Sequence, residues 1–257
     1  MSIRSIGQIR SSFIRHAALV WDCLSCLLWP PQCRLCQSAI NDGGTFLCAT
    51  CWKELSQSIG GYYCSRCGRS VSPYGRLAEG CGHCFEEKVN TDGILRVGTY
   101  ESTLRNLILQ LKFREMTEFE DLLGRMLQAV FETRSWSEPV DFLVPVPLHW
   151  RRRLERGFNQ SYLLARSLSR FGIPINRDLV RIRYTRRQWN LTPPQRRRNV
   201  KGAFAVRKDH LFSGKTLCLI DDITTSGATL SECAQTLKQA GAKKVYVVVL
   251  AVAEQIW

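Results

Sequence analysis

From residue 93 onward, short continuous apolar runs alternate with longer segments in which apolar positions recur every three or four residues. The continuous runs predict strands at 93–100, 140–148, 179–184, 215–222 and 243–253. The periodic segments predict helices at 102–113, 119–132, 159–172 and 228–241. Strands that are apolar throughout are buried on both faces, so the alternation predicts an α/β fold in which helices flank a parallel sheet.

The first 30 residues show helical spacing of their apolar positions, at Phe13, Ala17, Val20, Leu24 and Leu27. A signal peptide is the alternative interpretation, because arginines precede the apolar stretch. Asp22 interrupts that stretch, however, and no small-x-small cleavage site follows it. We therefore expect an N-terminal amphipathic helix over residues 1–30 and a cytoplasmic protein without a membrane span.

Residues 31–88 have little aliphatic periodicity and contain four C-x-x-C pairs, separated by 11, 12 and 13 residues. Two such pairs can supply four thiolates to one tetrahedral zinc ion, and paired thiols without an export signal indicate a reducing compartment. The pairs predict a double zinc-ribbon module with two structural zinc ions, held by Cys33, Cys36, Cys48, Cys51, Cys64, Cys67, Cys81 and Cys84. Sequential and interleaved pairing both remain open. A fifth pair, Cys23 and Cys26, is interpreted as helix core, with a metal or redox role as the alternative.

The chain has a formal net charge of +14, and the excess is concentrated between residues 151 and 208. This stretch contains 17 Lys and Arg residues and only two acidic residues. A concentrated basic stretch indicates a polyanionic ligand, either nucleic acid or phosphate groups. A solvated basic face is the alternative.

The segment "LCLIDDITTSGATL", residues 217–230, places two carboxylates at the end of an apolar strand and small hydroxylated residues before the next helix. Unpaired backbone N–H groups at a helix N-terminus bind phosphate, and Gly227 permits a tight turn. Asp221 and Asp222 would repel a bare phosphate unless they accept hydrogen bonds from the hydroxyls of an attached ribose. The segment therefore predicts a site for a ribose 5-phosphate.

Residues 217–229 resemble the phosphoribosyl pyrophosphate (PRPP) signature of type I phosphoribosyltransferases: four apolar residues, two acids, one apolar residue and then T-T-S-G-A-T. Segments 100–115, 144–165 and 183–204, with the C-x-x-C pairs, resemble the ComF/GntX family, whose members are associated with DNA uptake in competent bacteria and with the use of DNA as a nutrient. The resemblance implies a type I phosphoribosyltransferase-like domain over residues 89–257, which follows the zinc-ribbon module in the sequence. It also implies PRPP with Mg²⁺, or a ribose-5-phosphate nucleotide, as ligand, and single-stranded DNA or a DNA-uptake helicase as a further partner.

By this resemblance, the ribose hydroxyls are held at the catalytic centre by Asp221 and Asp222. The 5-phosphate is held by Thr224, Thr225, Ser226, Gly227, Ala228 and Thr229. The pyrophosphate loop comprises Arg153, Arg156, Gly157, Asn159 and Gln160, for which a basic helix start on the surface is the alternative. Residues 184–200 contain five arginines and little apolar periodicity, so they are interpreted as a mobile loop. The resemblance makes this loop a flexible lid, with family positions at Thr185, Gln188, Arg196 and Asn199.

Three functions remain open on this fold. An enzyme would displace pyrophosphate from C1 of the ribose with a nitrogen nucleophile, although the sequence shows neither an obvious general base nor a base-binding hood. A non-catalytic accessory protein would bind single-stranded nucleic acid through basic and aromatic side chains. A PRPP-sensing regulator would bind PRPP without releasing pyrophosphate.

Overall fold

The computed structural model describes residues 31–40, 46–74, 80–86, 89–113, 117–186 and 191–254. The expected helix of residues 1–30, which includes Cys23 and Cys26, lies outside this part of the chain, as does Gln188. The chain divides into two compact units, Met1–Ser56 and Gln57–Trp257. The first four zinc-ligand cysteines fall in the smaller unit and the other four in the larger one. The expected domain boundary at residue 88 stays a prediction.

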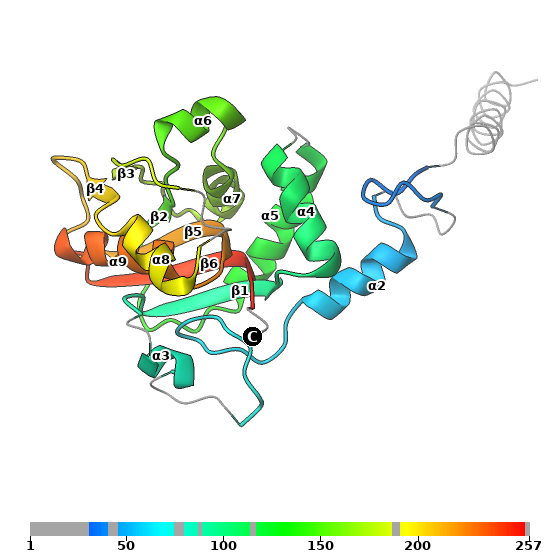
Figure 1. Ribbon diagram of the computed structural model, residues 1–257, viewed down its shortest axis with the longest axis horizontal. Helices are drawn as coiled ribbons and strands as arrows, with labels where there is room; N and C mark the ends of the chain where they lie inside the picture. The colour runs from blue at the N-terminus through cyan, green and yellow to red at the C-terminus, as the bar shows by residue number, and fades with distance from the viewer. Residues whose placement is uncertain are drawn as a thin grey trace, which may run out of the picture. The chain divides into compact units, whose positions relative to one another are not determined.

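A four-stranded parallel sheet forms the centre of the larger unit, in the order β1–β6–β5–β2 (Figure 1). The strands are β1 (Gly93–Thr99), β2 (Phe142–Pro145), β5 (Thr216–Thr224) and β6 (Lys244–Val252). β5 and β6 pair along their whole length and are buried almost throughout. The predicted α/β fold with a parallel sheet is therefore confirmed, and its apolar strands are the ones buried on both faces.

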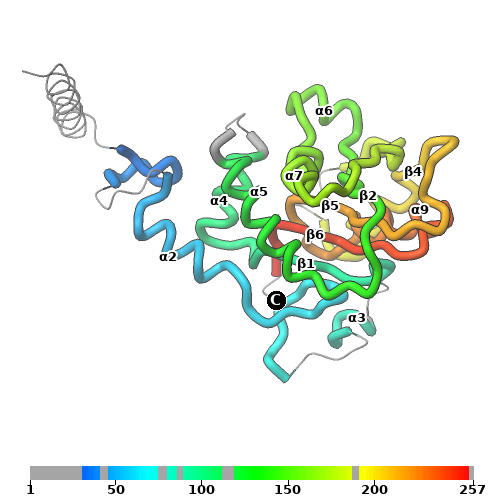
Figure 2. Tube along the Cα trace, turned by 180° about the vertical axis from the view of Figure 1, so that it is seen from behind, coloured from blue at the N-terminus to red at the C-terminus, as the bar shows by residue number. Residues whose placement is uncertain are grey.

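Helices cover both faces of this sheet (Figures 1 and 2). On one face, α5 (Thr117–Glu132) and α7 (Gln160–Leu168) pack together, with α4 (Ser102–Phe113) beside α5. On the other, α9 (Ala228–Gln239) packs on β5 and β6, and its core residues join alternate strand residues in one apolar cluster: Leu217, Leu219, Val245, Val247, Val249, Leu230, Cys233 and Leu237. Burying one such aliphatic side chain contributes roughly 1.5–3 kcal/mol, so this packing holds the strands in register.

Between β2 and β5 the chain forms a separate two-stranded ribbon, in which β3 (Leu179–Arg181) pairs antiparallel with β4 (Phe204–Val206). Helix α8 (Pro193–Val200) lies between these strands, so the interpretation of residues 184–200 as a loop is wrong for residues 193–200. Gln195 Oε1 accepts a hydrogen bond from the N–H of Thr192 at 2.9 Å, and prolines occupy the first positions of the helix. These are start signals that need no apolar stripe, which is why periodicity did not reveal the helix.

The remaining elements are short. They are α2 (Ala49–Ser58), α3 (Gly82–Glu86), α6 (Trp150–Arg156) and a 3₁₀ helix (Ser169–Phe171) that follows α7. Over the ranges that the structure describes, no helix is both long and apolar enough to cross a membrane.

The eight predicted zinc ligands form two tetrads, in sequential order: Cys33, Cys36, Cys48 and Cys51, then Cys64, Cys67, Cys81 and Cys84. In each tetrad the four sulfur atoms lie within 4.8 Å of one another. The sulfur atoms of Cys36 and Cys48 are 3.7 Å apart, as are those of Cys64 and Cys84. Tetrahedral zinc with Zn–S bonds of about 2.3 Å requires a separation of about 3.8 Å. The tetrads therefore fit two structural zinc ions, and four thiolates leave no position on the metal for a substrate.

Arg96 of β1 connects the second ribbon to the sheet within the larger unit. Its side chain is buried, and the guanidinium donates hydrogen bonds to Glu254 Oε1 at 3.0 Å and to Ser70 Oγ at 2.8 Å. The ring of Tyr63 lies beneath it, with 5.0 Å between the guanidinium carbon and the ring centroid. A buried cation costs several kcal/mol unless it is paired, so these partners make the second ribbon part of the same core as β1.

Gly98 allows β1 to pass close to the end of α2. Ile59, directly after α2, pairs with Gly98 in an isolated antiparallel β-bridge. The N–H of Gly60 donates a hydrogen bond to the carbonyl of Val97 at 2.9 Å. A Cβ at Gly98 would lie 1.9 Å from the carbonyl oxygen of Ser58. Because that neighbour is backbone, it cannot rotate away, and only glycine fits at this position.

We expect zinc analysis to separate the two tetrads. Purified protein should contain two zinc ions per chain, and Cys36→Ser and Cys67→Ser should each remove one. Only Cys67→Ser should lower the unfolding temperature of the larger unit, because its tetrad shares that unit's core. Native mass spectrometry gives the metal content, and calorimetry gives the unfolding transitions.

Cys233→Ala serves as the matched control, since Cys233 is a buried cysteine outside both tetrads. It should leave two zinc ions bound. Zinc loss in this control, or a Cys36→Ser effect on the larger unit as great as that of Cys67→Ser, would contradict the assignment.

Gly98→Ala should destabilise the larger unit by about 1–3 kcal/mol, because overpacking against backbone forces the two segments apart. The matched control is Gly82→Ala, where a Cβ meets nothing within 4 Å. That change should stay within about 0.5 kcal/mol. Urea denaturation of the zinc-loaded proteins measures both free energies of unfolding, and equal midpoints would refute the close approach.

Candidate functional site

The loop between β5 and α9 forms the centre of the candidate site. β5 ends at Thr224 and α9 begins at Ala228, so the turn contains only Thr225, Ser226 and Gly227. Gly227 is the residue before the helix and has a φ of 72°, a left-handed conformation that favours glycine. The first N–H groups of a helix have no intrahelical acceptor, so the start of α9 presents donors and the positive end of its dipole to this loop.

Asp221 and Asp222 lie on β5 immediately before the loop. Asp221 Oδ1 accepts hydrogen bonds from Ser161 Oγ at 2.8 Å and from the N–H of Asp222 at 3.0 Å. Asp222 is only 8% exposed, and its Oδ1 accepts from the N–H of Ile223 at 2.8 Å. Donors from β5 and α7 therefore hold both carboxylates in place at the end of the strand.

A cavity of about 170 Å³ opens beside the loop. Six of the eight residues predicted to bind PRPP line it: Asp221, Thr224, Thr225, Gly227, Ala228 and Thr229. Asp222 and Ser226 do not. Arg196 of α8, a predicted lid residue, also lines this cavity, and burial lowers the pKa of its guanidinium. The fold thus brings the Arg196 guanidinium, from the segment between β3 and β4, to the cavity that Asp221 and the start of α9 also line.

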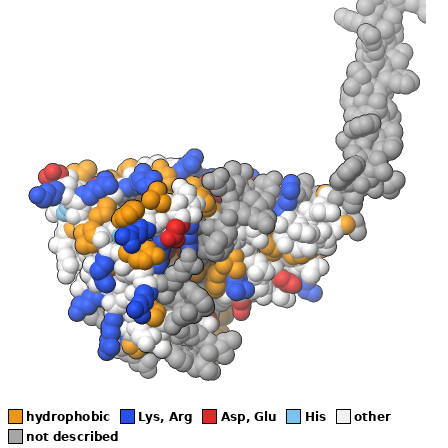
Figure 3. All heavy atoms as spheres, turned by 45° about the horizontal axis from the view of Figure 1, so that its top comes forward, with side chains coloured by type: hydrophobic (Ala, Val, Ile, Leu, Met, Phe, Trp, Pro, Cys, Tyr) orange, Lys and Arg blue, Asp and Glu red, His pale blue; other side chains and the backbone are white. Residues whose placement is uncertain are grey.

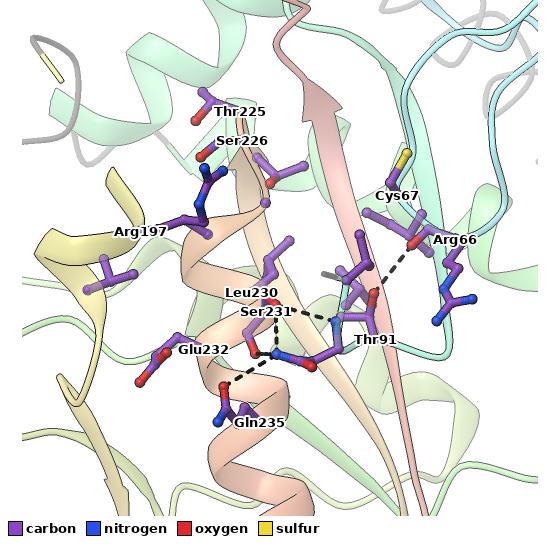
Figure 4. Close-up of a pocket in the computed structure, with 18 of the residues that line it drawn as sticks. Arg66, Cys67, Thr91, Arg197, Thr225, Ser226, Leu230, Ser231, Glu232 and Gln235 are labelled. Atoms are coloured by element: carbon purple, nitrogen blue, oxygen red, sulfur yellow. Dashed lines mark hydrogen bonds between the residues drawn. The ribbon is translucent and has the colours of Figure 1, made fainter. Parts of the chain in front are cut away.

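A second cavity, of about 520 Å³, adjoins the same loop and extends between α9, α8, the start of β1 and the second ribbon (Figure 4). Inside it, Asn90 Nδ2 donates to Ser231 Oγ at 3.0 Å and to Gln235 Oε1 at 3.4 Å. Arg197 of α8 extends toward the loop (Figure 4). Ser226 also lines this cavity, and its Oγ is buried without a hydrogen-bond partner among the described residues. An unsatisfied buried hydroxyl costs about 1–3 kcal/mol, a cost that a ligand oxygen would offset.

The predicted pyrophosphate residues lie in α6, in the turn that follows it and at the start of α7. Asn159 is the N-cap of α7: its Oδ1 accepts from the N–H of Ser161 at 3.2 Å, and its Nδ2 donates to the carbonyl of Val146 at 3.1 Å. Gln160 is 2% exposed, and its Oε1 accepts from Arg156 Nη1 at 3.3 Å. Across the described ranges, Gln160 Nε2 has no hydrogen-bond acceptor. The turn therefore holds a second buried donor that a ligand would satisfy.

The predicted pyrophosphate residues do not converge on one cavity. Arg153, Gly157 and Asn159 line a cavity of about 480 Å³ beyond the edge strand β2, whereas Arg156 and Gln160 do not line it. Sequence proximity therefore grouped five residues of which only three line this cavity.

The other two described residues of the predicted lid, Asn199 and Thr185, make hydrogen bonds that stabilise the segment between β3 and β4 itself. Asn199 Oδ1 accepts from the N–H of Arg186 at 3.2 Å, and its Nδ2 donates to the carbonyl of Arg186 at 3.0 Å. Thr185 is buried, and its carbonyl accepts from Arg152 Nη2 at 2.8 Å. Neither lines the small cavity, and Gln188 lies outside the described residues.

Ser161 is the site residue that sequence reasoning did not single out. Its hydroxyl contacts Asp221, 60 positions further along the chain. The available signal was its place in the first turn of α7, directly after two predicted site residues.

Positively charged side chains are numerous around α6. Figure 3 shows many Lys and Arg side chains and few acidic ones on the face that it presents. Burial, and then the charge of Arg152, lowers the pKa of the Arg181 guanidinium. Burial and neighbouring arginines also lower the pKa of His149, whose Nδ1 accepts a hydrogen bond from the N–H of Arg151 at 3.3 Å. Cations are therefore crowded here, which favours the binding of an anion.

Comparison with known proteins supports the two-part organisation. Residues 24–85 match the double zinc ribbon domain family, and residues 153–255 match the phosphoribosyl transferase domain family. The chain is 31% identical to competence protein F of Haemophilus influenzae, over 84% of this chain and 94% of the relative. It is 33% identical to the DNA utilization protein YhgH of Escherichia coli, over 85% and 95%. It is 27% identical to the competence protein ComFC of Bacillus subtilis, over 81% and 89%.

These similarities cover both the zinc ribbons and the parallel-sheet domain, and they extend over most of each relative. Together with the two cysteine tetrads and the sheet topology, they confirm the resemblance that the motifs indicate. The chain belongs to the ComF/GntX family, in which a double zinc ribbon precedes a phosphoribosyltransferase-type domain.

Proposed function

We propose that the β5–α9 loop binds PRPP, or a nucleotide that contains ribose 5-phosphate, together with Mg²⁺. One observation carries this proposal: β5, which carries Asp221 and Asp222 near its end, leads through a three-residue turn into the N-terminus of α9, beside a cavity lined by both elements. Anion donors and hydroxyl acceptors are thereby adjacent, and a phosphorylated sugar needs both.

The phosphate end of the ligand contacts the start of α9. Its oxygens accept hydrogen bonds from the loop N–H groups and from small hydroxyl side chains such as Thr225 and Thr229. The buried Ser226 hydroxyl, which lacks a partner among the described residues, supports an acceptor at this turn. Arg196 and Arg197 approach the loop from α8 and add positive charge to it.

The sugar end contacts the carboxylates. Asp221 and Asp222 accept hydrogen bonds from vicinal ribose hydroxyls, because ionised carboxylates are acceptors only. Their oxygen donor set also suits Mg²⁺, which when bound with PRPP neutralises part of the diphosphate charge. Beyond them, the Gln160 amide and the Arg156 guanidinium provide donors for a leaving pyrophosphate.

For turnover, a nitrogen nucleophile displaces pyrophosphate at C1 of the ribose: a C–N bond forms, the C–O bond breaks and its electron pair leaves with the pyrophosphate, and the nitrogen releases its proton to water. Positive charge develops on the sugar ring, and carboxylates held beneath it stabilise that charge. Each cysteine tetrad already supplies four thiolates to its metal, so the zinc ribbons take a structural role.

Binding of single-stranded DNA is the second candidate function. The basic stretch of residues 151–208 favours it, as do the names of the relatives, which refer to competence and DNA utilization. Exposed aromatic side chains within that stretch, Trp150 at its edge and Tyr184, can act as stacking surfaces. A protein partner of the DNA-uptake machinery, such as a helicase, is compatible with the same surface.

Asp221→Asn with Asp222→Asn should weaken Mg²⁺-dependent PRPP binding at least 100-fold. Loss of two charge-assisted hydrogen bonds, at about 1.5–3 kcal/mol each, accounts for this magnitude. Isothermal calorimetry on zinc-loaded protein, with and without Mg²⁺, measures the affinity. The control removes the same charge from α5 through Glu120→Gln with Asp121→Asn and should bind PRPP like the parent. No binding of PRPP or AMP to the parent protein would refute the proposal.

The affinity for single-stranded DNA should respond to salt and to the same carboxylate variant differently from the affinity for PRPP. Log affinity should fall linearly with log salt, with a slope near −0.7 per phosphate contacted, so four contacts give about −3. Asp221→Asn with Asp222→Asn should leave that affinity unchanged or improve it, because it removes negative charge. Fluorescence anisotropy with a labelled oligothymidylate measures both effects. A slope near zero, or loss of binding in the carboxylate variant, would contradict this second function.

A further inference from the structure

A third cavity lies apart from the β5–α9 loop. It has a volume of about 480 Å³ and is bounded by the end of β2, the α6–α7 turn and β3. No residue between Asp221 and Thr229 lines it. Its size falls within the range of about 300–1,000 Å³ that is typical of small-molecule sites. Three residues of the predicted pyrophosphate loop line it, Arg153, Gly157 and Asn159, but the carboxylates and the β5–α9 loop of the proposed PRPP site do not.

Four arginines line this cavity, and no acidic residue does: Arg153, Arg177, Arg181 and Arg207. The guanidinium groups of Arg153 and Arg207 have no ion pair and no hydrogen bond to any other residue that the structure describes. Arg181 is half-buried, and its Nε has no hydrogen-bond acceptor within the described ranges. Four like charges around one cavity repel each other, so the arrangement favours an anion with several oxygens.

The rest of the wall is apolar and aromatic. Pro145 at the end of β2, and Pro147 and Leu148 after it, line the cavity. The rings of Phe158 and Tyr162 line it from the α6–α7 turn and from α7. Trp150, which is 59% exposed, adds a third ring at the start of α6. Arg177 already lies over the Tyr162 ring, 4.9 Å from its centroid. A small inorganic anion would leave these surfaces unused, whereas a flat aromatic group would cover them.

We propose that this arginine and aromatic cavity is a second nucleotide-binding site, separate from the PRPP site. The guanidinium groups hold the phosphate of the ligand, and the aromatic and apolar wall contacts its base. The same chemistry is offered by a free nucleoside monophosphate and by one nucleotide of a single strand. The proposal goes beyond PRPP binding and does not depend on it, because the two cavities share no residue.

The test compares two double variants, each of which removes two positive charges. The cavity pair is Arg177→Gln with Arg207→Gln. The matched pair, outside the cavity, is Arg166→Gln with Lys208→Gln. Arg166 and Lys208 are exposed members of the same basic stretch, and neither lines this cavity. Both pairs are made in the Asp221→Asn and Asp222→Asn background, so that nucleotides report on the new site alone. Calorimetry with AMP, dTMP and inorganic phosphate, and anisotropy with an oligothymidylate, measure binding.

The cavity pair should weaken nucleotide binding at least tenfold, and the matched pair should leave it within twofold. Binding of AMP or dTMP identifies a free nucleotide as the source, and binding of the oligothymidylate alone identifies a strand; both support the site. Equal weakening by the two pairs, or nucleotide affinity no greater than that for inorganic phosphate, overturns it. No binding by any probe also overturns it.

A further variant separates the base contact from the charge. Tyr162→Leu removes a ring but no charge, so it should weaken nucleotide binding severalfold while leaving the affinity for inorganic phosphate unchanged. Cavity variants made in the parent chain should still bind PRPP, which keeps the outcome of this test distinct from that of the PRPP proposal.

Discussion

The end of β5 is the constraint on which the functional part of this structure depends. The strand is buried on both faces as far as Ile220, where its hydrogen bonds to β6 and its apolar side chains hold it in the sheet. The strand stays paired with β6 to Thr224, after which the chain must leave the sheet and begin α9 at Ala228, with only three residues between them. The short turn aligns unpaired N–H groups with two carboxylates, so packing in the core determines the geometry at the surface.

The zinc ribbons differ in how they relate to this core. The second tetrad belongs to the larger unit, and the buried Arg96 ties the surrounding ribbon to β1 through Ser70 and Glu254. A buried guanidinium is costly by itself, so both partners are needed, and the ribbon and the end of β6 become one structure. The same ribbon supplies a wall of the large cavity beside the β5–α9 loop. A structural zinc ion held by this tetrad would therefore stabilise that wall.

The basic residues between positions 151 and 208 lie on several surfaces instead of one. Arg196 lines the small cavity with the carboxylates, Arg197 approaches the loop from the large cavity, and Arg177 and Arg207 line the cavity beyond β2. Charge that is continuous in sequence is thus distributed by α6, α8 and the β3–β4 ribbon among three cavities. Periodicity did not predict helix α8, because its start is stabilised by the Thr192–Gln195 capping contact and by prolines, and an arginine takes one of its two buried positions in place of an apolar stripe.

The sequence by itself determined the α/β fold, the eight cysteines that form the tetrads, and the strand, turn and helix order of residues 217–230. Each of these depends on spacing within a short segment: apolar runs, C-x-x-C pairs, and two acids followed by a turn before a helix. Only the tertiary structure decided that the eight cysteines divide in sequential order, that Ser161 would meet Asp221, that Ser226 would not line the small cavity that Thr225 lines, and that Arg153 would separate from Gln160. Side-chain direction at a loop depends on packing between segments distant in the chain, and no local pattern encodes that packing.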